Sequence, residues 1–382
     1  MTKTVLISGA GIGGSTLAYW LADRGFHVTV VERATGQRSS GNPVDVKGPA
    51  IDVVEQMGTM PRLRAASSDV SQMNFVNNTG RRVARVDLKA FQGSAGDREV
   101  EVPRADLAAI LLDASRDHAE FLWGDTITGL TQQADGVDVT FEKAQTRRFD
   151  FVIGADGLHS TVRRLVFGAE SEFIRHMGIY IATVRIDEPF GSDQEVLIYN
   201  TPGRAVSVHP SNGHALAAFM FRHQGVPGFD HRDTELHKRL VIEAFTDQGW
   251  RVPELLDRVR DTDDLFFDSV SKGELPHWAD GRIALLGDAA SCVSLFGDGS
   301  TLAIAGAYTL AEELASTPDA HEAAFRRYET RHRVLVDPKL NGISTAAAML
   351  IPATKAGIAL RNTATRVIPA VTAIRSRVRH AA

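Results

Sequence analysis

The chain is nearly free of cysteine. Cys292 is the single cysteine among 382 residues, which excludes an internal disulfide and a cysteine-rich metal site. We therefore expect no metal and a reducing, cytoplasmic location. The chain also lacks any apolar run near the ~20 residues that a membrane-spanning helix needs, so no stable membrane association is expected. Positive charge is not in excess either, and the net charge of −5 gives no support for nucleic-acid binding.

Several catalytic patterns are absent as well. The chain has no HExxH metal motif, no recognisable Ser/His/Asp arrangement and no internal repeat. Its content of 43% hydrophobic and 23% charged residues is ordinary for a soluble globular protein. A length of 382 residues favours two or three domains.

A glycine-rich turn lies near the start of the chain. The apolar run 5–7 leads into Gly9, Gly11 and Gly14, and the next apolar run ends at Glu32. Gly9 permits a tight turn, Gly11 lets the backbone approach a pyrophosphate, and Gly14 lets the following helix pack on the strand. Glu32, 18 residues after Gly14, is placed to accept hydrogen bonds from a ribose. The pattern predicts a dinucleotide site; the open alternative is a structural turn with Glu32 facing solvent.

The order of the predicted elements indicates a discontinuous α/β fold. Strands and helices alternate in the first part of the chain, whereas β-like runs at 180–186, 195–200, 205–210 and 214–222 follow one another, separated by glycine and proline turns. We interpret them as an antiparallel sheet inserted into a nucleotide-binding domain. The predicted partition is a Rossmann-like domain of residues 1–72, 98–175 and 277–330, an inserted β-sheet domain of residues 73–97 and 176–276, and a C-terminal helical segment of residues 331–382.

Two further predicted strands end in polar motifs. One ends in Gly154-Ala155-Asp156-Gly157 and continues into a polar helix start that reaches Arg163. The other ends in Gly287-Asp288, before a glycine loop, Gly297-Asp298-Gly299, and a long helix. Each motif alone is compatible with an ordinary strand-end turn. The three motifs in this order are far more specific.

With these motifs the chain resembles the single-component, FAD-dependent aromatic hydroxylases of the para-hydroxybenzoate hydroxylase fold. Within them it is most similar to the compact branch that includes the tetracycline-inactivating monooxygenases. The resemblance covers about residues 4–330. It implies FAD as cofactor, NADPH or NADH as transient reductant, and O2. The implied reaction hydroxylates a small aromatic or polycyclic, polyketide- or antibiotic-like substrate through a flavin hydroperoxide. The chain departs from the family at Ser291, where a ring is usual, and in a flavin loop, 293–299, without proline.

The resemblance also implies roles for individual residues. Arg33 would lie along the adenine, Arg104 would contact the ribityl–phosphate region, and Asp288 would bind the ribityl chain. Two structural alternatives remain open, namely Asp288 as a turn cap and Arg104 as a surface residue at a helix start. No catalytic side chain is identified. The full set of expected cofactor-binding residues is Gly9, Gly11, Gly14, Glu32, Arg33, Arg38, Asp45, Arg104, Asp156, Gly157, Asp288, Gly297 and Gly299.

The substrate side is less sharply defined. Phe219, Phe221 and Arg222 end a strand that we expect to border the pocket, with core packing left open for the two phenylalanines. A cleft beside an apolar sheet suits a planar aromatic ligand. The helix beginning near Gly299 would favour the anionic reduced flavin by roughly 0.3–2 kcal/mol. We expect a monomer or weak dimer that acts on a small molecule. An FAD-dependent reductase or dehydrogenase without oxygen transfer, and a non-catalytic flavoprotein, are the alternatives.

Overall fold

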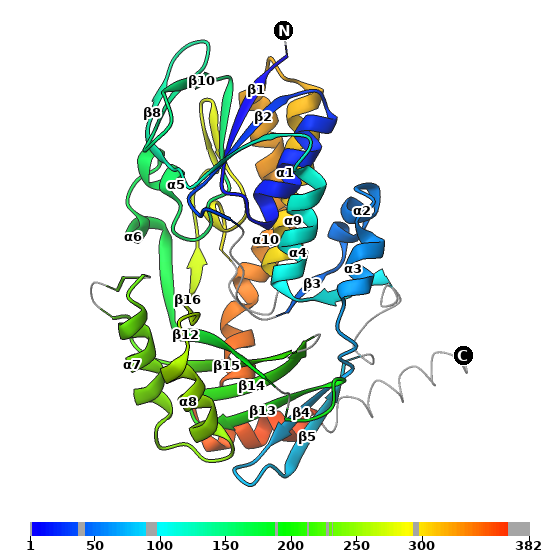
Figure 1. Cartoon of the computed structure of the whole chain (residues 1–382), viewed down its shortest axis with the longest axis vertical. Coiled ribbons are helices and arrows are strands. Elements are labelled where there is room, and N and C mark those ends of the chain that lie inside the picture. The colour runs from blue at the N-terminus through cyan, green and yellow to red at the C-terminus, as the bar shows by residue number, and fades with distance from the viewer. Residues whose placement is uncertain are drawn as a thin grey trace.

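Two large β-sheets organise the computed structural model, one toward each end of its longest axis (Figure 1). The structure describes residues 2–36, 43–88, 98–187, 190–211, 214–226, 229–230, 232–292 and 298–365. The long helix α10 (His321–Leu350) runs from the first sheet toward the second (Figure 1).

The first sheet has six strands in the order β17-β18-β11-β1-β2-β7. All neighbours in it run parallel except β17, which pairs antiparallel with β18. The central residues Val5, Leu6 and Ile7 are fully buried, as expected for a parallel sheet covered on both faces. The strands are β1 (Thr4–Ser8), β2 (His27–Glu32), β7 (Glu120–Trp123), β11 (Phe151–Gly154), β17 (Ala279–Asp280) and β18 (Ile283–Leu285).

Helices and a small sheet cover this six-stranded sheet. Helix α1 (Ile12–Asp23) packs against both α4 (Arg104–Ser115) and α9 (Asp298–Ser316) on one side (Figure 1). A three-stranded antiparallel sheet lies on the other side, and its side chains Val137, Val139 and Phe149 join the same core. Its strands are β8 (Ile127–Gln132), β9 (Val137–Phe141) and β10 (Arg147–Phe149), and α5 (Thr161–Val166) contacts β8.

The strand order reverses beside β1. The chain leaves β1 for β2 on one side and later returns to β11 on the other. Backbone hydrogen bonds hold the carboxyl ends together: Gly9 N–H donates to Val31 O and Ala155 N–H to Ser8 O, both at 2.8 Å. In open α/β sheets, ligands bind at such a reversal, outside the carboxyl ends of the strands. All three sequence motifs therefore end at one edge of one sheet.

The second sheet has seven strands in the order β16-β12-β15-β14-β13-β4-β5. Its pairs are antiparallel except β13 with β4, which is parallel, so the predicted antiparallel sheet has one exception. Helices α7 (Thr234–Phe245) and α8 (Val252–Asp261) bury one face of it. The strands are β4 (Gln72–Val76), β5 (Arg82–Asp87), β12 (Ile174–Ile186), β13 (Glu195–Thr201), β14 (Arg204–Ser211), β15 (His214–Arg222) and β16 (Phe266–Gly273).

Helix α10 connects the two sheets. Its residues Phe325 and Tyr328 belong to the core of the six-stranded sheet, whereas Ala347 packs with Met220 of the second sheet. No single described helix is long and apolar enough to cross a membrane. Helix α10 and the helix at residues 355–365, which meet at a bend of 100°, have the length and composition of a membrane span only when taken together. The remaining elements are β3 (Val44–Val46), β6 (Val100–Val102), α2 (Pro49–Gln56), α3 (Met60–Ala66), α6 (Glu170–Phe173) and the 3-10 turn η2 (Gly287–Ala289).

The structure confirms the predicted α/β fold class, with a Rossmann-like sheet, a second sheet and a C-terminal helix. The second sheet takes its strands from residues 72–87 and 174–273. The domain boundaries themselves stay a prediction.

Candidate cofactor site

The three glycines of the first motif differ in what surrounds them. A Cβ atom on Gly14 would lie 1.9 Å from Gly9 O, and one on Gly9, where φ is +103°, would lie 2.6 Å from Ala155 O. The fold itself therefore requires glycine at both positions. A Cβ on Gly11 would meet nothing within 4 Å. Gly11 thus leaves the backbone open at the helix start, where an incoming phosphate would lie.

The Glu32 carboxylate is fastened to the surrounding backbone. One oxygen accepts from Ala10 N–H at 2.9 Å and the other from Ala34 N–H at 2.8 Å. Glu32 therefore holds the loops after β1 and β2 in register, and it is half-buried rather than fully facing solvent. Lone pairs remain for a ribose, because a carboxylate has about four acceptor positions. The neighbouring Arg33 is exposed and donates to Thr161 Oγ1 at 3.1 Å.

The second motif forms a capped turn. The Asp156 carboxylate accepts hydrogen bonds from Ser8 Oγ at 3.2 Å and from Thr161 N–H at 2.8 Å, and it also accepts from Ser160 Oγ. These bonds join the end of β1 to the start of α5. Gly157 has φ of +79°, and a Cβ on it would meet nothing within 4 Å, so this turn also presents open backbone. Asp156 is therefore largely committed to the fold.

The third motif carries an acid of a different kind. Asp288 is half-buried in η2 and makes no hydrogen bond within the described part of the chain. Burial raises its pKa above the ordinary aspartate value; Arg104 opposes this effect, and Asp268 adds to it. Arg104 is exposed at the start of α4 and forms no hydrogen bond or ion pair with the described residues, so its charge is available near this edge. A carboxylate and a guanidinium that lack partners among the described residues fit a ligand that bears hydroxyl and phosphate groups.

A buried arginine that sequence reasoning left without a role helps build this edge. Arg163 is fully buried, and its guanidinium donates to Ala289 O at 3.2 Å, to Leu158 O and to Glu170 at 3.1 Å. It thereby ties the second motif to the third. A charged residue at the end of the Asp156 motif was the only available signal, and it did not identify this partner.

His159 extends the same network toward the second sheet. Its Nδ1 lies 3.0 Å from Glu170 and its Nε2 lies 3.9 Å from Asp268 on β16. Burial lowers the His159 pKa, but the hydrogen bonds and charges of Asp268 and Glu170 outweigh burial and raise it to about 9. The imidazole is therefore cationic at neutral pH. Asp268 is distant in sequence, so no local pattern predicts this pair.

The start of α9 lies against the same edge. A Cβ on Gly13 would be 3.5 Å from Ala303 Cβ, and one on Gly287 would be 3.6 Å from it, so α9 borders both the first and the third motif. Thr301 Oγ1 donates to Asp45 O at 2.9 Å, which brings Asp45 and the Gly299 region together. Arg38 and Gly297, two other expected cofactor residues, lie outside the described residues.

The expected substrate residues take up other positions. Phe219 and Phe221 are fully buried beneath α7, where both rings contact Phe245 at 5.2 and 5.8 Å between centroids. This geometry favours core packing for both. Arg222 donates to Ile351 O at 2.9 Å and to Ala347 O at 3.4 Å, so it caps the C-terminal end of α10.

The opposite face of the second sheet carries a polar pair. Ser207 on β14 contacts His209 Nε2 at 2.9 Å. Burial lowers the pKa of His209 to about 4, so this side chain is neutral at pH 7. Ala218 and Thr183 follow Ser207 across the neighbouring strands.

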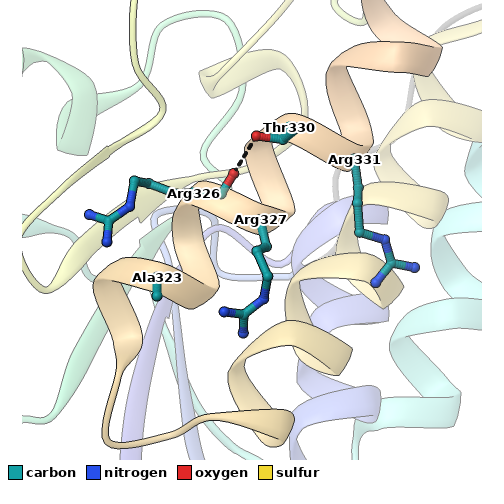
Figure 2. Close-up of a pocket in the computed structure, with 5 residues that line it drawn as sticks. All are labelled: Ala323, Arg326, Arg327, Thr330 and Arg331. Atoms are coloured by element: carbon teal, nitrogen blue, oxygen red, sulfur yellow. Dashed lines mark hydrogen bonds between the residues drawn. The ribbon is translucent and has the colours of Figure 1, made fainter.

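A separate pocket lies along the first turns of α10 (Figure 2). It is lined by Ala323, Arg326, Arg327, Thr330 and Arg331. Arg327 and Arg331 both pair with Glu313, at 2.5 and 2.6 Å, and Arg331 also pairs with Glu312 at 2.7 Å, so two carboxylates balance the two charges. None of the motif residues lines it. The described residues also contain no group of three or more His, Cys, Asp or Glu side chains that could hold a metal ion.

Comparison with known proteins identifies the class. The model of a family described as "FAD binding domain" matches residues 2–337. A flavin-dependent monooxygenase from an unknown prokaryotic organism is 37% identical over 330 residues, which cover 86% of this chain and 85% of the relative. The chain therefore belongs to the family of FAD-binding oxidoreductases that includes such monooxygenases. The expected cofactor, FAD, and the expected enzyme class are confirmed.

Solved structures narrow the resemblance further. The tetracycline destructase Tet(55) is 33% identical with a TM-score of 0.82, and the alignment covers 96% of each chain. The tetracycline destructase Tet(51) is 29% identical with a TM-score of 0.83, covering 97% of this chain and 98% of that one. The expected similarity to this compact branch is therefore confirmed.

Proposed function

We propose that the protein is an NAD(P)H- and O2-dependent monooxygenase that hydroxylates a small aromatic or polycyclic substrate. The observation that carries the proposal is the meeting of Gly11, Glu32, Asp156 and Asp288 at one strand-order reversal, next to a second sheet. The ends of several strands thus offer groups that can contact a ligand at one edge, which suits an extended dinucleotide better than a simple structural turn. The names of the relatives support oxygen transfer as the reaction.

The roles of the residues follow from their partners. The backbone at Gly9, Gly11 and Gly14 would hold the pyrophosphate, Glu32 would accept from the adenosine ribose, and Arg33 would lie along the adenine. Asp288, which accepts from no donor among the described residues, would accept from a ribityl hydroxyl, with Arg104 near the phosphate. FAD, when bound, supplies the electron-transfer and oxygen-transfer chemistry.

The substrate would lie against the polar face of the second sheet. Ser207 and the neutral His209 offer hydroxyl and imidazole groups that donate and accept without a full charge. The side chain of Ile181 shares that face by strand pairing and is apolar, whereas its pairing partner Met220 is covered by the end of α10. Such a surface suits a planar ring system that bears phenol, enol or carbonyl groups, as the tetracycline destructase relatives also suggest.

A single labelled-oxygen experiment tests this function. Purified protein loaded with FAD is mixed with NADPH or NADH and a panel of tetracyclines and phenols under 18O2. We expect one panel member to accelerate NAD(P)H oxidation and to gain one labelled oxygen atom. Product that forms without label, and equally well without oxygen, would instead support the reductase alternative. A flavin that stays oxidised with excess NAD(P)H across the panel would support a non-catalytic flavoprotein.

A further inference from the structure

A network of alternating acidic and basic side chains lies at the first turn of α9. Lys47, just after β3, places its ammonium 2.9 Å from Asp45 Oδ2 and 3.0 Å from Asp298 Oδ1. Lys339 on α10 lies 3.0 Å from the other Asp298 oxygen. The order Asp45–Lys47–Asp298–Lys339 thus joins β3, α9 and α10. Two carboxylates and two ammonium groups balance one another.

Hydrogen bonds from two hydroxyl groups of α9 fix the backbone of the segment that carries Asp45 and Lys47. Ser300 Oγ and Thr301 Oγ1 donate to Asp45 O at 3.0 and 2.9 Å. The Lys47 N–H in turn donates to Thr301 Oγ1 at 3.2 Å. Asp298 has only 13% of its side chain exposed, so solvent screens its charge weakly. The ammonium of Lys47 is therefore held between the two acids.

The Asp298 carboxylate offsets the positive potential of the helix end on which it lies. A helix N-terminus carries partial positive charge, which favours a nearby anion. Asp298, in the first turn of α9, works against that effect if its charge is not balanced. Burial lowers the pKa of Lys47, but Asp45 and Asp298 raise it above the ordinary lysine value, so the balancing charge persists at neutral pH.

This network of charges lies near the edge of the sheet where we place the cofactor. Ala303, one turn into α9, lies against both Gly13 and Gly287, at the edge where the motifs meet. Two-electron reduction by NAD(P)H with uptake of one proton leaves one net negative charge on a flavin. Unbalanced carboxylates at this edge would make that charge less favourable.

We propose that Lys47 is an electrostatic positioning residue that neutralises Asp45 and Asp298 and so raises the reduction potential of the bound FAD. The inference rests on the proposed placement of FAD at this edge. It concerns a role that the motifs do not assign, because Lys47 belongs to none of them. Lys339 acts through Asp298 in the same direction and more weakly, since it contacts Asp298 alone of the two acids.

The test compares Lys47→Met with Lys47→Arg by redox titration of the bound FAD, alongside the affinities for oxidised FAD and the melting temperatures. We expect Lys47→Met to bind oxidised FAD within about threefold of the unmodified protein and reduced FAD about tenfold more weakly. For a two-electron couple, a tenfold change corresponds to a potential about 30 mV lower. Lys47→Arg should keep the original potential.

Two further variants separate charge from structure. Lys47→Met combined with Asp298→Asn removes one charge of each sign and should restore most of the potential. Lys238→Met is the matched control, because Lys238 bonds to Arg260 O on the far side of the second sheet. An unchanged potential in FAD-loaded Lys47→Met overturns the inference, as does a double variant that stays as low as the single one.

If Lys47→Met does not fold, Lys339→Met decides the question. A smaller shift in the same direction supports the inference, and an unchanged potential contradicts it. A protein that binds no FAD in any form would contradict the proposed function itself. The two failures are therefore distinguishable.

Discussion

Replacing Gly11 by alanine separates cofactor binding from folding. Gly11 has φ of −75° and ψ of −170°, which alanine adopts without strain, and a Cβ there meets nothing within 4 Å. Alanine is a weaker N-cap than glycine, so we expect a loss of stability below about 1 kcal/mol. For a chain of 382 residues, at about 2.1 cal/mol/K of unfolding entropy per residue, that corresponds to a change in melting temperature of only about 1 °C.

The effect on FAD should be much larger. The added methyl group would lie between the α1 N-terminus and the pyrophosphate and would break at least one charge-assisted hydrogen bond. Such bonds contribute about 1.5–3 kcal/mol each. Because about 1.4 kcal/mol is tenfold in affinity, we expect FAD to bind roughly 10- to 150-fold more weakly. Fluorescence quenching during reconstitution of the apoprotein measures this directly.

Gly14→Ala provides the contrasting variant. Its Cβ would lie 1.9 Å from Gly9 O, so α1 has to move away from β1, at a cost near the upper end of the about 1–3 kcal/mol typical of overpacking. Gly342→Ala, on α10 with no neighbour within 4 Å, controls for a generic glycine replacement. FAD affinity in Gly11→Ala equal to that of the unmodified protein would refute the proposed pyrophosphate contact. Equal losses of stability at positions 11 and 14 would refute the distinction between them.

Three other predictions test neighbouring parts of the site. Because the His159 pKa is raised to about 9, its stabilisation is complete below pH 6.5 and disappears as pH rises through 9. Allowing for solvent screening, urea unfolding should show about 1–2 kcal/mol of this loss, and His159→Gln should abolish it. Asp288→Ala and Arg104→Ala should each lower FAD occupancy on purification, and unchanged flavin content in both would show that the assigned roles are wrong. Tyr328→Phe removes the hydrogen bond to Leu285 O and should cost about 1–3 kcal/mol in thermal unfolding, with FAD affinity nearly unchanged.

The meeting of the three motifs at one sheet edge was predictable because their signals are local, whereas the cofactor contacts of the individual residues stay a prediction. Each motif contains a buried strand that leads into glycine, with an acid close behind in the second and third motifs, and parallel strands place their carboxyl ends together. Gly9, Asp156 and Asp288 therefore meet as expected once β1, β11 and β18 are neighbours. The long helix after Gly297 and the inserted sheet were also predictable from local patterns, the sheet from β-like runs separated by glycine and proline turns.

Contacts between distant segments were not predictable in this way. The His159–Asp268 pair and the Lys47–Asp298 pair each join residues more than one hundred positions apart, and neither has a local pattern. Because side chains alternate between the two faces of a strand, Phe219 and Phe221 were predicted to share one face. Which face α7 and α8 cover depends on packing that the strand itself does not encode.

The acids of the three motifs are not equivalent, although a sequence fingerprint treats them alike. Glu32 and Asp156 already accept hydrogen bonds from backbone N–H groups, so replacing either one disturbs the protein before any ligand is involved. Asp288 has no such donor in the described ranges of the chain, and burial makes its charge costly in the absence of one. Binding a hydroxyl-bearing cofactor would relieve that cost. Substitutions at Gly11 and Asp288 should therefore mainly lower the affinity for FAD. Substitutions at Gly14, Glu32 and Asp156 should mainly lower the stability of the protein.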